Sequence, residues 1–122
     1  MTRRPFEQIL TVADLETTAD RLGNFFFTPG ALKFFNSRIG YRLYRVDNSH
    51  GYFVTSEKRD EERRYWTVRQ YKVIHESDGR DILDIDRASE FQAYASAKGA
   101  EQRAEELQGY ALIDPKSFDI ER

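Results

Sequence analysis

The stretch Tyr41–Ile74 constrains the fold of this chain more than any other part of its sequence. Aromatic and β-branched residues are interleaved there with arginines, and polar turn residues divide them into three runs. Such residues suit the pleated, half-buried surface of a strand better than a helix. A fourth run follows the hairpin signal Ser77-Asp78-Gly79. We therefore expect an antiparallel meander of four strands, over residues 41–46, 52–56, 64–74 and 81–86.

Three helices are predicted from capping patterns, in which a hydroxyl side chain accepts a hydrogen bond from the first helical turn. In the first and third, an acid or an amide also stands three residues after the cap, as in a capping box. Gly23 and Gly109 supply the stops for these two helices. The predicted helices begin after Thr11, Thr28 and Ser89 and cover residues 12–22, 29–35 and 90–108.

The element order α-α-β-β-β-β-α predicts an α+β fold of two layers, in which helices pack on one face of the four-stranded antiparallel meander. The length of 122 residues suits one domain over residues 1–122. Its last part, residues 110–122, contains apolar positions and one proline, which favours a docked arm or a fifth strand.

The composition excludes several kinds of chemistry for this chain. The chain has no cysteine, which excludes disulfides and thiolate catalysis. Its apolar runs are far shorter than the roughly 18 residues of a membrane-spanning helix, and its N-terminus lacks the apolar core of a signal peptide. We therefore expect a cytoplasmic protein. Nine phenylalanines and seven tyrosines compensate for a shortage of aliphatic residues in the core.

Charge is distributed unevenly along the chain. Residues 33–72 carry ten basic and five acidic side chains, whereas residues 73–122 carry six basic and twelve acidic ones. Two interpretations stay open. These segments either form faces of opposite charge, one of which attracts polyanions, or they neutralise each other within the fold.

Neither face of the predicted strands is cleanly apolar, because arginines and aromatic residues occur at both alternate sets of positions. In one interpretation, arginine stems lie over aromatic rings and the face is simply amphipathic. In the other, the rings and guanidiniums form a docking platform for a partner. The candidate partner-binding residues are Arg42, Tyr44, Arg63, Arg64, Trp66, Arg69 and Tyr71.

Motifs for catalysis, metals or cofactors are not recognisable. His50 and His75 lack the spacing of metal ligands, and no glycine-rich phosphate loop is present. Asp81, Asp84 and Asp86 could hold Mg²⁺ or form a solvated acidic edge. We therefore predict no catalytic residues, no cofactor and no metal.

Five segments resemble a family of short uncharacterised proteins of bacteriophages and mobile elements. These segments are Gly23–Phe26, Gly30–Arg38, Tyr52–Lys58, Arg64–Arg69 and Glu90–Ser96. The chain departs from the family pattern at Trp66, an extra residue that predicts a β-bulge. The resemblance supplies no catalytic residues. By analogy of origin, it implies a protein that binds and inhibits or modulates a host protein or nucleoprotein machine, including defence systems such as CRISPR effectors.

These observations predict a non-enzymatic binding protein with no membrane partner. Its surface would be the arginine- and aromatic-rich sheet face together with the charged loop Glu57–Arg64, or the acidic C-terminal half acting as a phosphate mimic. The alternative is a nucleic-acid-binding protein that uses the basic, aromatic sheet face.

Overall fold

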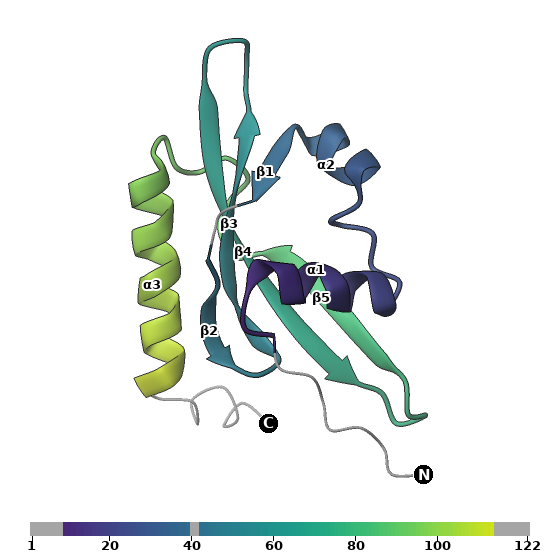
Figure 1. The fold of residues 1–122 in the computed structure, drawn as a ribbon. Coiled ribbons are helices and arrows are strands. Elements are labelled where there is room, and N and C mark those ends of the chain that lie inside the picture. Colours follow the sequence, from purple (N-terminus) through teal and green to yellow (C-terminus); the bar gives the residue numbers. More distant parts are fainter. Residues whose placement is uncertain (1–8, 40–41, 114–122) are drawn as a thin grey trace.

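The computed structural model describes residues 9–39 and 42–113 (Figure 1). Helix α1 spans Val12–Arg21 and helix α2 spans Pro29–Phe35. The capping box of α1 is confirmed, because Thr11 Oγ1 accepts from the Asp14 N–H at 3.1 Å and the Asp14 carboxylate accepts from the Thr11 N–H at 3.2 Å. Helix α2 begins at the predicted Thr28 cap and ends at Asn36, whose φ of 55° is left-handed.

The sheet has five antiparallel strands: β1 (Ser37–Ile39), β2 (Tyr44–Asp47), β3 (His50–Lys58), β4 (Arg64–His75) and β5 (Asp81–Arg87). Strands β2 to β5 form the predicted meander. Strand β1 was not expected. It pairs with the end of β3 at Thr55–Glu57, whereas β2 pairs with the start of β3, so two short strands share one edge.

The prediction of a β-bulge at Trp66 is wrong. Strands β3 and β4 pair without interruption from His50↔Lys72 to Lys58↔Arg64, and Trp66 lies opposite Ser56. The irregularity in pairing instead lies in β2, between Arg45 and Asp47. Trp66 therefore keeps the alternation of the strand.

The third helix begins later than its capping pattern predicted. Helix α3 spans Ala97–Ile113, and Ser89 caps no helix, since its hydroxyl accepts a hydrogen bond from the Val68 N–H at 3.0 Å. Residues 88–94 run beside β4, where Trp66 and Tyr94 exchange backbone hydrogen bonds of 2.8 and 3.1 Å. We call residues 88–94 the β4-edge segment.

The end of α3 was also predicted wrongly. The helix passes through Gly109, the expected stop, and includes Tyr110–Ile113. These four residues were expected to begin a docked arm or fifth strand, and the rest of that prediction, residues 114–122, lies outside the described residues.

Helices cover both faces of the sheet, which corrects the expectation that they pack on one face. On one face, Leu15 and Ala19 of α1 pack with Phe53, Tyr71 and other core residues. On the opposite face, α3 packs against β3 and β4 through a second cluster, which contains Tyr52, Val54, Val68, Ala100 and Ala104. Figure 1 shows α3 on one side of the sheet and α1 across the other. The α+β class and the antiparallel sheet are confirmed.

The two cores explain why the strand faces do not separate into apolar and polar. Seven successive residues of β3, Gly51–Glu57, are buried. Alternating side chains enter one core or the other, so neither set must be polar. Among the helices of the described ranges, none is both long and apolar enough to cross a membrane.

Candidate functional site

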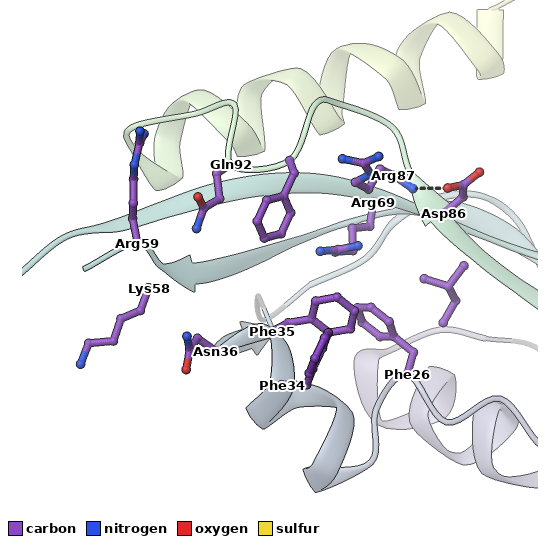
Figure 2. A pocket seen from close by; sticks show the side chains of 12 residues that line it. Phe26, Phe34, Phe35, Asn36, Lys58, Arg59, Arg69, Asp86, Arg87 and Gln92 are labelled. Atoms are coloured by element: carbon purple, nitrogen blue, oxygen red, sulfur yellow. Dashed lines mark hydrogen bonds between the residues drawn. The ribbon is translucent and has the colours of Figure 1, made fainter. Parts of the chain in front are cut away.

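A cleft of about 710 Å³ opens between α2 and the edge of the sheet where β5 ends (Figure 2). Its size is in the range of ligand sites. The lining residues come from α2 and the segment before it, the ends of β3 and β5, the middle of β4, and the β4-edge segment. They are Phe26, Phe34, Phe35, Asn36, Lys58, Arg59, Arg69, Ile85, Asp86, Arg87, Phe91 and Gln92.

Arg69 lies at the floor of the cleft and is held rigidly. Its Nη2 donates to Glu57 Oε2 at 3.1 Å and its Nε donates to Thr55 Oγ1 at 2.9 Å. The guanidinium carbon is 5.0 Å from the centre of the Phe26 ring and 5.8 Å from that of Phe35. Burial lowers the pKa of Arg69, and the Glu57 carboxylate opposes this shift. An arginine keeps its charge under such conditions, so the floor carries a fixed guanidinium whose charge is paired with Glu57 (Figure 2).

Glu57 is fully buried, and a network of hydroxyl groups surrounds its carboxylate. Thr67 Oγ1 donates to Oε1 at 2.8 Å, and the hydroxyls of Thr55 and Ser37 donate to Oε2. Thr67 Oγ1 also accepts from the Gln92 N–H at 2.9 Å. The network therefore joins the buried ion pair to the β4-edge segment and fixes one wall of the cleft.

The rim of the cleft is basic and aromatic. Lys58, Arg59 and Arg87 are exposed and give three cations beside the carboxylate of Asp86, whereas the charge of Arg69 is already paired with Glu57. Phe34 is 80% exposed and Phe91 is 41% exposed. Such exposed rings are unusual for a residue type that normally lies in the core. The cleft can thus offer aromatic faces and guanidinium donors to one ligand at the same time.

The predicted partner-binding residues do not form one surface. Tyr44 and Tyr71 are buried in different cores, and Tyr71 is fully buried. Arg42 is exposed and lies over the Tyr44 ring at 4.6 Å, and Arg63 is exposed in the β3–β4 connection. Of the predicted set, only Arg69 lines the cleft.

Arg64 and Trp66 lie together in a second hollow of about 250 Å³ beside the start of α3. Arg64 donates from Nε to Ser56 Oγ at 3.0 Å and from Nη2 to the carbonyl oxygens of Asn36 and Ser56 at 2.9 and 2.8 Å. Burial lowers the pKa of Arg64, and Arg38 adds to this effect. These contacts bind the guanidinium to the protein's own backbone, which gives it a structural role.

The acidic and histidine residues do not assemble into a metal centre. Within residues 9–39 and 42–113, no three His, Asp or Glu side chains come together as metal ligands. Asp81 hydrogen-bonds His75 Nδ1 at 2.7 Å, and His50 Nε2 lies 2.9 Å from Gln70 Nε2. Asp84 and Asp86 are exposed on β5, whereas the Asp81 side chain is 13% exposed, so only two of the three carboxylates lie on a solvated edge.

Most of the cleft was not predicted from the sequence. Phe34, Phe35 and Phe91 were assigned to predicted helices, and Arg59 was noted only as part of a charged loop. One signal was available. The pattern Gly30–Ser37 places two adjacent phenylalanines on a helix of one to two turns, which can bury only one of them. Phe91 and Gln92 line the cleft because the β4-edge segment runs beside β4. The sequence pattern at Ser89 instead predicted a helix for these residues.

Comparisons with curated proteins and with solved structures gave no match. A comparison with protein families matches residues 11–105 to a family described as of unknown function. The match covers every residue that lines the cleft. It confirms membership of an uncharacterised family, which is the coarser part of the resemblance seen in the sequence. The chain therefore belongs to the family of unknown function DUF7447.

Proposed function

We propose that this chain is a non-enzymatic binding protein that engages a macromolecular partner through the cleft. One observation supports this above all: four phenylalanines and three exposed cations, Lys58, Arg59 and Arg87, line a single cleft beside one exposed carboxylate, Asp86. Aromatic and arginine side chains are the groups that contribute most to binding energy at interfaces. Here they are gathered in the cleft between α2 and the β4-edge segment.

The chemistry of the lining also favours recognition over catalysis. Guanidinium and ammonium groups donate hydrogen bonds to anions, but with ordinary pKa values above 10 they exchange protons poorly near neutral pH. Arg69 is fixed by Glu57 and Thr55 before any ligand arrives. Such preorganisation reduces the entropy lost on binding.

The nature of the partner rests on the resemblance to short phage and mobile-element proteins. By that analogy, the partner is a host protein or nucleoprotein machine, such as a defence complex, and binding inhibits or modulates it. The cleft supplies the surface for this interaction in place of the sheet face, since both sheet faces are covered by helices.

Capture of partners from a bacterial host lysate tests the proposal, with cleft variants matched to controls. Phe34→Ala and Arg87→Glu should each reduce the captured material strongly. Ile113→Ala is the control for Phe34, since Ile113 is 83% exposed but lies on α3, and Lys98→Glu is the control for Arg87. Equal capture by the cleft variants and the controls would contradict the proposal.

A further inference from the structure

The cleft brings cations close together, and a bound anion would reduce the repulsion between them. Arg69 of β4 and Arg87 of β5 are direct cross-strand partners. Like charges in that position repel each other, and Arg87 accordingly contributes to the lowered pKa of Arg69. Glu57 pairs with Arg69, so the positive excess of the lining comes from Arg87, Lys58 and Arg59 against the carboxylate of Asp86. A ligand with several negative charges fits this arrangement.

The aromatic part of the cleft suits flat rings. Phe34 on α2 and Phe91 on the β4-edge segment are both exposed and belong to walls built by different elements. Figure 2 shows Phe26, Phe34 and Phe35 on the helix side, across the cleft from Gln92 on the sheet side. Exposed aromatic faces beside cations are the features with which proteins bind unpaired bases and their phosphates.

Two amides in the lining suit the edges of bases. Asn36 and Gln92 line the cleft, and each amide side chain offers both donors and an acceptor. Base edges present both kinds of group. Ile85 is the single aliphatic side chain in the lining, so the cleft offers little to the aliphatic anchors of a peptide.

We propose that the cleft binds a segment of single-stranded nucleic acid, with bases stacked on Phe34 and Phe91 and phosphates at Arg87, Arg59 and Lys58. This inference rests on the proposed function and names the part of the partner that enters the cleft. The 80% exposure of Phe34 favours a strand over a free nucleotide. A small ligand would be mostly buried in its site, whereas a strand can continue along the exposed rim.

Fluorescence anisotropy with the purified full chain tests the inference. The probes are labelled DNA and RNA single strands of about ten nucleotides, the corresponding duplexes, adenosine monophosphate as competitor, and a peptide of alternating glutamate and phenylalanine. At about 50 mM salt, the single strands should bind, and the affinity should fall with increasing salt. Phe34→Ala and Phe91→Ala should each weaken binding by about 5- to 150-fold. Arg87→Glu should weaken it and reduce the salt slope by about one or more.

The controls Ile113→Ala and Lys98→Glu should bind like the native chain. The inference is overturned if single strands do not bind, if Phe34→Ala binds them unchanged, or if duplex, nucleotide or peptide occupies the cleft in preference to the strand. Nuclease treatment of the lysate separates this failure from failure of the proposed function. Capture that depends on the cleft but survives nuclease would leave the binding function standing and reject the nucleic-acid ligand.

Discussion

Removing the guanidinium of Arg69 should destabilise this protein far more than the loss of an ordinary ion pair. Its Nη2 lies 3.1 Å from Oε2 of Glu57, and the two side chains are 6% and 0% exposed. In Arg69→Met, a side chain of similar length remains, but the Glu57 carboxylate stays buried without its cation. Stripping a partner from a buried charge costs about 3–5 kcal/mol.

The magnitude can be measured as coupling between the two residues. Glu57→Gln/Arg69→Met removes both charges and keeps an amide that can hydrogen-bond the hydroxyls of Thr55 and Thr67. The double variant should lose less free energy of unfolding than the two single variants lose together, and the difference should be about 2 kcal/mol. Urea unfolding followed by fluorescence and circular dichroism measures each variant. With a slope of about 2 kcal/mol per M, Arg69→Met should lower the midpoint by about 2 M.

A surface pair provides the control for this experiment. Arg103 Nη1 lies 3.0 Å from Oε1 of Glu106, but the side chains are 41% and 43% exposed. Arg103→Met should therefore cost less than about 1 kcal/mol. If Arg69→Met costs no more than this control, or if the two single losses add up to the double loss, the buried pair does not hold this site as argued.

Two further predictions concern the sheet. Gly51→Ala should destabilise the fold by about 1–3 kcal/mol in a thermal or urea scan, because a Cβ there would lie 2.5 Å from the Tyr71 hydroxyl oxygen. The control is Gly109→Ala in helix α3, where a Cβ would meet open space. This variant should stabilise the fold by about 0.5–1 kcal/mol. Burial lowers the pKa of His50 from 6.5, so the unfolded chain takes up its proton first as the pH falls. The neutral His50 side chain therefore makes its full contribution to the stability of the fold above about pH 6.5. This contribution declines as the pH falls towards the pKa of His50 in the folded chain. His50→Gln should remove that part of the decline between about pH 7 and 5, and an unchanged pH profile would contradict this.

Local signals predicted the parts of the fold that local chemistry determines. The cap at Thr11, the proline start of α2 and the turn at Ser77–Gly79 each act within a few residues, and each appears where it was expected. Strands β3 to β5 follow from composition and from short connections. Their ends differ from prediction by up to two residues, because pairing with neighbours extends a strand past its most typical residues.

Tertiary contacts overrode the sequence pattern at Ser89. An N-cap hydroxyl and a strand-edge hydroxyl accept the same kind of bond, from a backbone N–H. At Ser89 the donor is Val68 of β4, and Gln92 adopts a left-handed φ of 58° that no helix contains. The sequence pattern could not distinguish these two donors, since one of them lies 21 residues away.

The mixture of arginine and aromatic residues in 41–74 has a physical explanation in the two cores of the sheet. A sheet with one exposed face must place its charges on that face, but this sheet is covered on both, so Arg69 could remain only by pairing with Glu57 and with hydroxyls. The aromatic residues of the same strands were then used in the two cores. The buried Arg69 guanidinium forms the floor of the cleft, where it lies near the rings of Phe26 and Phe35. The cleft combines residues from α2, β4, β5 and residues 88–94, which is why strand patterns alone could not predict it.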